Sequence, residues 1–125
     1  MFTTFQSPDA PPAVGPYSQA IEKNGFIFTS AQLPLDPVTG DLVGGSISEQ
    51  TRQVCKNLGA VLNACGLDYG NVLQAVCYLR NMDDFAEFNA VYGEYFTHKP
   101  TRVCVAVSGL AKGAGVEISL VAARD

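Results

Sequence analysis

Pro100-Thr101-Arg102-Val103-Cys104-Val105-Ala106-Val107 is a stretch in which the character of the side chains alternates with a period of two residues. Its three valines fall on one face of an extended chain, and Arg102, Cys104 and Ala106 fall on the other. A guanidinium on an otherwise small, apolar face is costly unless it meets an anion or water. The stretch therefore predicts a strand on which Arg102 is a candidate functional residue.

A second stretch with the same period follows, Val116-Glu117-Ile118-Ser119-Leu120-Val121. Glu117 and Ser119 lie opposite its apolar side chains. Residues 110–115 have the composition of a turn, which predicts that the two strands are neighbours. Two interpretations stay open: Arg102 binds a carboxylate beside a working Glu117, or the two residues form an ion pair on a solvated face.

Turn and cap signals predict the elements nearer the N-terminus. Asn24-Gly25 is a hairpin signal, so strands are expected at residues 17–22 and 26–30. The capping box that begins at Ser46 predicts a helix from there to about Cys65. The first half of the chain is therefore expected to be a hairpin followed by a helix.

The second half alternates strand and helix. Residues 71–80 form an almost continuous apolar run, which predicts a strand buried on both faces. Asp84 with Glu87 predicts the cap of a second helix, whose inner face is expected to carry aromatic rings and the buried amide of Asn89. The resulting order, ββ-α-β-α-ββ, is typical of an α+β fold with two helices on one face of a mixed sheet. The other face is left uncovered, so self-association is predicted.

Composition indicates one domain over residues 1–125, with 47% hydrophobic and 16% charged residues. The low charged fraction suggests that part of the surface is buried in an oligomer. The net charge is −4 and no cluster of Lys or Arg exists, which argues against nucleic-acid binding. Neither a signal peptide nor a run approaching the roughly 20 apolar residues of a membrane span is present, so a cytoplasmic protein without membrane contact is expected.

The cysteines do not form a recognisable framework. Cys55, Cys65, Cys77 and Cys104 include no CxxC pair, and His98 is the single histidine. Reduced, structural thiols are therefore expected, with neither a disulfide framework nor a zinc site.

A series of motifs occurs in the order and spacing of one protein family. They are Gly15-Pro16-Tyr17-Ser18-Gln19-Ala20, Phe28-Thr29-Ser30-Ala31-Gln32-Leu33-Pro34, Asp36-Pro37-Val38-Thr39-Gly40, Met82-Asp83-Asp84-Phe85-Ala86-Glu87-Phe88-Asn89-Ala90-Val91-Tyr92, Pro100-Thr101-Arg102 and Gly115-Val116-Glu117-Ile118. On these motifs the chain resembles the RidA (YjgF) family from about Gln6 to Ala123.

The resemblance implies a chorismate-mutase-like fold with a mixed six-stranded sheet. It also implies a homotrimer with three clefts between subunits. The implied activity is hydrolysis of reactive 2-enamino and 2-imino acids, such as 2-aminoacrylate and 2-iminobutanoate, to 2-oxo acids and ammonia. No metal and no organic cofactor are expected.

The resemblance also assigns roles to residues of the candidate site. Arg102 is expected to hold the substrate carboxylate through two parallel hydrogen bonds, which a lysine could not do. Glu117 is expected to orient the attacking water and relay protons. The other residues expected to contact substrate are Tyr17, Ser30, Asn89 and, through its backbone, Cys104.

Several positions depart from the family pattern. Ala31 replaces a glycine, Ala111 a frequent proline and Ser119 a common second glutamate, and the link from Phe96 to Pro100 is short. Neither Arg102 nor Glu117 is affected, so the expected consequence is a cleft of different shape.

Two other functions stay open. Members of the family have been described as endoribonucleases that inhibit translation, but the acidic charge and the lone His98 give this interpretation little support. The second alternative is a non-enzymatic trimer that binds small carboxylates or acts as a chaperone. Intact Arg102 and Glu117 favour catalysis over that option.

Overall fold

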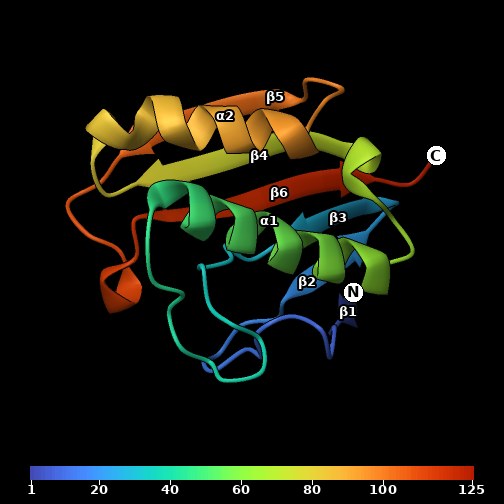
Figure 1. Ribbon diagram of the computed structural model, residues 1–125. Helices are drawn as coiled ribbons and strands as arrows, with labels where there is room; N and C mark the ends of the chain where they lie inside the picture. The colour runs from blue at the N-terminus through green and yellow to red at the C-terminus, as the bar shows by residue number, and fades with distance from the viewer.

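The computed structural model describes residues 1–125 as one six-stranded sheet that carries two helices on the same face (Figure 1). The strands are β1 (Thr3–Phe5), β2 (Ala20–Lys23), β3 (Phe26–Thr29), β4 (Val72–Leu79), β5 (Thr101–Ala106) and β6 (Val116–Ala123). The helices are α1 (Ile47–Ala64) and α2 (Phe85–Tyr95), and short 3₁₀ turns lie at η1 (Tyr69–Asn71), η2 (Met82–Asp84) and η3 (Ala111–Gly113). The predicted α+β architecture is confirmed. Neither helix is long and apolar enough to cross a bilayer.

The strands lie in the order β1-β2-β3-β6-β4-β5, and only β4 and β5 are parallel. The prediction that the last two strands are neighbours is therefore wrong, because β4 lies between them. A parallel pair needs a long crossover connection, and α2 provides it between β4 and β5. The link after β5 then passes the end of β4, where Val107 N–H donates to Leu79 O and Arg80 N–H donates to Gly115 O.

Strand boundaries differ from the sequence prediction at three places. β1 was missed, because three residues show no usable alternation. β2 begins at Ala20 and not at Tyr17, which lies in the preceding loop. β4 is buried on one face only: Ala75, Cys77 and Leu79 are buried, whereas the side chains between them are partly exposed. The other apolar face of β4 therefore has no partner within one chain.

The hairpin and the first helix form where the local signals predict them. Asn24 and Gly25 both adopt positive φ, at 54° and 82°, as the two central residues of a tight turn between β2 and β3 require. Ser46 Oγ accepts a hydrogen bond from Glu49 N–H at the start of α1. Gly66, with φ 77°, ends this helix by donating its N–H to Asn63 O.

The predicted cap of the second helix is wrong. Asp84 makes no side-chain capping bond, and the side chain of Asn81 instead accepts from Asp83 N–H in the turn before α2. Glu87 Oε2 accepts from Ser48 N–H, at 2.8 Å, in the first turn of α1. A carboxylate near a helix N-terminus is stabilising, so Glu87 helps to hold the two helices together.

The core lies between the helices and the sheet, and it is built from one face of each strand together with α1 and α2. The opposite face carries no helix and exposes large apolar side chains. We call it the open face. Phe26 and Phe28 of β3 and Val103 and Val105 of β5 are 45, 45, 48 and 39% exposed there. An apolar sheet surface of this kind is typical of an interaction site.

Gly59, in the middle of α1, allows Tyr69 to pack across the helix. A Cβ at this position would overlap the Tyr69 hydroxyl, which donates to Cys55 O at 2.8 Å. We expect Gly59→Ala to lower the free energy of unfolding by about 1–3 kcal/mol, because the ring must shift and its hydrogen bond is lost. Gly93→Ala in α2 is the matched control, since nothing lies within 4 Å of its Cβ, and it should be neutral or slightly stabilising. Urea unfolding at one fixed protein concentration measures both; equal effects would contradict the prediction.

Candidate functional site

Arg102 lies on the helix-facing side of β5, opposite Ala75 in the register with β4. Its Nη1 donates to Asn89 Oδ1 on α2 at 2.6 Å. Its guanidinium carbon lies 4.8 Å from the centre of the Tyr92 ring and 5.5 Å from that of Phe85. The side chain is therefore held by two aromatic rings and one amide, which fixes the direction of its remaining donors.

No carboxylate neutralises Arg102 within the chain. The two ion pairs are Arg52–Glu94 and Arg124–Glu22, and neither includes Arg102. The interpretation of an ion pair between Arg102 and Glu117 is therefore wrong. A half-buried guanidinium with free donors and no anion is suited to bind an external carboxylate or phosphate.

Glu117 lies on the open face, opposite Tyr78 in the register of β6 with β4. Its side chain is half-buried, makes no hydrogen bond or ion pair within the chain, and burial raises the pKa of its carboxyl. A carboxylate that is partly desolvated and unpaired is a better proton acceptor than an exposed one.

Arg102 and Glu117 point to opposite faces of the sheet. Paired residues of adjacent strands point the same way, so Arg102 shares the face of buried Ala75, whereas Glu117 shares the face of Tyr78. Ala75 and Tyr78 are three positions apart on β4, which is an odd number, and therefore lie on opposite faces. One chain alone cannot bring the two functional groups to the same small molecule.

Tyr17 and Ser30 lie close to each other at the start and end of the β2–β3 hairpin. Ser30 Oγ donates to Ser18 O at 2.7 Å, and its N–H donates to Gln19 O. Tyr17 is 48% exposed, and its hydroxyl accepts from Val14 N–H at 3.4 Å. By alternation from Phe28, Ser30 lies on the open face, which is also the face of Glu117.

Asn89 and Cys104 join Arg102 on the helix side. Asn89 is exposed, so the expectation of a buried amide is wrong, and the partner of its side chain is Arg102. Cys104 is half-buried beside Cys77, its partner in the register, and burial raises the pKa of its thiol. Such a thiol stays protonated at neutral pH, which agrees with a silent side chain at this position.

The candidate residues thus fall into two half-sites. We call Asn89, Arg102 and Cys104 the arginine half-site, and Tyr17, Ser30 and Glu117 the glutamate half-site. A hollow of about 440 Å³ adjoins the first and is lined by Asn89, Tyr92, Gly93, Phe96, Thr97, Lys99, Pro100 and Arg102.

Tyr92 is a residue of this region whose role the sequence did not reveal. It was expected only as part of the aromatic inner face of α2. The structure places its ring under Arg102, and its buried hydroxyl has no hydrogen-bond partner. The spacing of three residues between Asn89 and Tyr92, one helical turn apart, was the signal that could have paired them beneath one cation.

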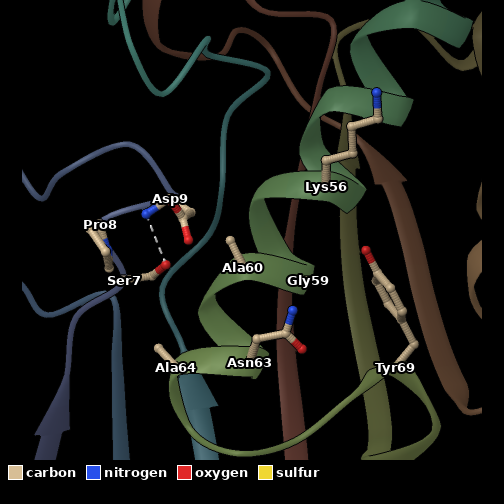
Figure 2. Close-up of a pocket in the computed structure, with 9 residues that line it drawn as sticks. All are labelled: Ser7, Pro8, Asp9, Lys56, Gly59, Ala60, Asn63, Ala64 and Tyr69. Carbon is tan, nitrogen blue, oxygen red and sulfur yellow. Dashed lines mark hydrogen bonds between the residues drawn. The ribbon is translucent and has the colours of Figure 1, made fainter.

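A second hollow lies along α1, away from both half-sites, and contains none of the predicted residues. Figure 2 shows Ser7, Pro8 and Asp9 on one flank of the helix and Tyr69 on the other. The Ser7 side chain is engaged with the backbone, accepting from Asp9 N–H at 3.1 Å. No three His, Cys, Asp or Glu side chains converge where a metal ion could be held.

Comparison with known proteins places this geometry in a family. The model of the family described as Endoribonuclease L-PSP matches residues 7–124. A RutC family protein from Pyrococcus horikoshii is 47% identical over 118 residues, which are 94% of each chain. YyfA from Yersinia pestis, described as a member of the conserved Rid protein family, is 40% identical with a TM-score of 0.96 over 99% of this chain and 100% of its own.

TdcF from E. coli, whose crystal structure has bound serine, is 33% identical with a TM-score of 0.93 over 98% of this chain and 99% of its own. These matches extend over nearly all of this chain. The chain belongs to the RidA/YjgF family, the family also described as Endoribonuclease L-PSP.

Proposed function

We propose that the protein hydrolyses reactive 2-imino and 2-enamino acids to 2-oxo acids and ammonia. The observation that carries this proposal is the state of Arg102: a guanidinium fixed by Asn89 and two aromatic rings, half-buried and without an anionic partner. A 2-imino acid carries a planar carboxylate next to its reactive C=N carbon. Two parallel hydrogen bonds from Arg102 would fix both the position and the plane of that carboxylate.

Glu117 supplies the proton transfers in this proposal. Its carboxylate accepts a proton from a water molecule while the water oxygen bonds to the C=N carbon. The same group then returns the proton to the nitrogen. As the C–N bond breaks and the C=O bond forms, Glu117 passes the remaining hydroxyl proton to the nitrogen as well, and the nitrogen leaves as ammonia. Free imines already hydrolyse in water, so a positioned water and one proton relay, worth about 10²–10⁴-fold, are sufficient.

The active site in this proposal is assembled between two copies of the chain. The arginine half-site and the glutamate half-site face opposite ways in one chain, so a complete site needs one of each from neighbouring subunits. The apolar open face offers the surface for association, and we propose a homotrimer with a site at each of its interfaces. Sedimentation that finds a monomer at micromolar concentration would overturn this assembly.

The ligand of a relative supports the substrate class. TdcF binds serine, a small molecule with one carboxylate next to a carbon that carries nitrogen. A 2-imino acid has the same arrangement at the same carbon. No metal or organic cofactor has a part in the proposed steps. We place the reaction in the cytoplasm, where the four unpaired cysteines would stay reduced.

The proposal is tested by coupling the protein to a serine or threonine dehydratase and following the release of the 2-oxo acid. The enamine and imine leave the dehydratase as free intermediates, so an imine hydrolase accelerates the appearance of the product. Release that is the same with and without the protein would overturn the proposal. Cleavage of RNA by repurified protein that survives Arg102→Ala would favour the endoribonuclease alternative, against which the net charge of −4 speaks.

We expect the activity to depend on the protonation of Glu117. Burial raises the pKa of this carboxyl above the ordinary value of 4.5, so kcat should fall on acidification at a pH above 4.5. In Glu117→Gln this acidic limb should disappear together with most of the activity. A profile of kcat against pH for both proteins is the measurement, and an unchanged limb in the variant would assign it to another group.

The same pKa shift makes ionised Glu117 unfavourable for stability, although it is favourable for activity. Because the folded chain disfavours ionisation of this carboxyl, the free energy of unfolding falls as the pH rises from below the ordinary pKa to above the raised one. Glu117→Gln should therefore be at least as stable as the wild-type protein at pH 7. Loss of activity without loss of stability would separate a functional carboxylate from a structural one.

A further inference from the structure

A cavity of about 510 Å³ lies between the loop before β2 and the loop after β3. In Figure 1 these are the blue segment that follows β1 and the teal segment that leads towards α1, and they run side by side at the bottom of the view. We call it the Leu33 cavity. Its apolar walls are Pro11, Pro12 and Val14 on one side and Leu33 and Leu35 on the other, and Tyr17 also lines it.

Both walls are held by buried amide side chains. Gln19, 2% exposed, donates to Pro11 O at 2.8 Å and accepts from Ser7 N–H. Asn57 of α1, which is fully buried, donates to Leu33 O at 3.1 Å and to Leu35 O at 2.9 Å. Buried amides with satisfied hydrogen bonds are costly to displace, so the cavity is formed before any ligand arrives.

The rim of the cavity is polar. Lys112, exposed and with φ 60°, reaches across to donate from Nζ to Gly40 O at 3.2 Å. The charged and hydroxyl side chains that line the cavity are exposed. Of its apolar lining, Pro11 is buried, Leu33 and Leu35 are half-buried, and Pro12 and Val14 are exposed at its edge. A rigid apolar interior with a wet edge is the usual form of a site for the apolar part of a small molecule.

The cavity adjoins the glutamate half-site. Gln32 and Ile118 form an antiparallel bridge, and both are buried on the helix side. Their neighbours, Leu33 and Glu117, therefore lie across from each other on the opposite side. Tyr17 belongs both to the half-site and to the cavity lining. A substrate whose reactive carbon lies at Glu117 thus has the Leu33 cavity within reach of its side chain.

We propose that the Leu33 cavity receives the side chain of the substrate and selects 2-imino acids with bulky apolar side chains, of the size found in leucine or phenylalanine. This inference rests on the proposed function and names its preferred substrate class. The methyl and ethyl groups of the smallest imino acids would leave a cavity of 510 Å³ largely empty. Burial of each further methylene should raise affinity by about fourfold.

The test measures binding of stable 2-oxo acids by calorimetry: 2-oxobutyrate, 4-methyl-2-oxopentanoate and phenylpyruvate. We expect the wild-type protein to bind 4-methyl-2-oxopentanoate about 10-fold or more tightly than 2-oxobutyrate, as two added methylene equivalents require. Leu35→Trp fills the cavity from its wall and should abolish that preference while 2-oxobutyrate still binds. Val38→Trp is the matched control, because Val38 is 92% exposed in the same loop and does not line the cavity.

Retained binding of 2-oxobutyrate shows that a variant is folded. If Leu35→Trp is not folded, Pro12→Trp serves in its place, because it fills the cavity from the opposite wall. Equal affinities of the wild-type protein for the three acids would overturn the inference and leave the proposed function standing. Failure to bind any of them would overturn both. Preference for the larger acids that persists in both filled variants would show that the side chain lies elsewhere, and would also overturn the inference.

Discussion

Arg102→Ala is expected to lower kcat/KM for imine hydrolysis by about 10²–10³-fold, because the substrate loses a charge-assisted, two-bond contact that fixes its plane. Free imine still hydrolyses in water, so the residual rate should approach the rate without protein. The coupled dehydratase assay measures both. Arg52→Ala is the matched control: its exposed ion pair with Glu94 should contribute little to stability, and Arg52 belongs to α1 and to neither half-site.

Arg102→Lys distinguishes charge from geometry. A lysine keeps the positive charge but offers a single ammonium, and it cannot lie flat between Tyr92 and Phe85 while donating to Asn89. We therefore expect less than a tenth of the lost activity to return, since the cost of misplacing a reacting group is large. Full activity in Arg102→Lys would contradict the proposed grip on the carboxylate, because charge alone would then be sufficient.

The local elements of the fold could be predicted from the sequence because each carries its own signal. The positive φ values of Asn24 and Gly25, and the cap at Ser46, depend on residues next to one another in the chain. The order of the strands depends on long-range pairing, which no local pattern encodes. The insertion of β6 between β3 and β4 was therefore missed, although every one of these strands was recognised.

Contacts between elements were also predicted wrongly, because they too depend on residues that are far apart in the sequence. Glu87 has the spacing of a capping residue for its own helix, but it accepts a hydrogen bond from Ser48 at the start of the other helix. Asn89 lies at a helical spacing that suggested burial, but it is exposed and accepts a hydrogen bond from Arg102 of β5. In both cases the residue was correctly judged to have a polar partner, and the partner came from a distant part of the chain.

For the site, the sequence indicated the candidate residues but not how they lie relative to one another. The motifs made Arg102 and Glu117 the candidate functional residues, and alternation correctly placed each on the face opposite the branched apolar side chains of its strand. What alternation could not give was the relation between the strands: with β4 between β5 and β6, the two side chains lie on opposite faces. The ion pair between Arg102 and Glu117 that the sequence left open is thereby excluded. The two side chains can meet only between different chains of an assembly.

Co-assembly of Arg102→Ala with Glu117→Gln should restore activity that neither variant has alone. If each site takes its arginine from one chain and its glutamate from a neighbour, half of the arginine half-sites and half of the glutamate half-sites are intact in an equal mixture. Random assembly then makes about a quarter of the sites complete, since subunits in a closed ring are drawn independently. Co-expression of the two variants in equal amounts with the same tag, followed by the coupled assay on the whole purified pool of oligomers, is the measurement.

The matched control co-assembles wild-type chains with chains that carry both substitutions. A site shared between chains again leaves about a quarter of the sites complete, whereas a site contained in one chain would leave about half of them. The two mixtures should therefore have equal activity, and this equality cannot arise from partial activity of either single variant. Arg102 and Glu117 would act within one chain if the mixture of the two single variants were inactive and the mixture of wild-type and doubly substituted chains had half of the wild-type activity. Such a result would require the sheet to bring opposite faces to one ligand, which the register of β4 with both neighbouring strands forbids.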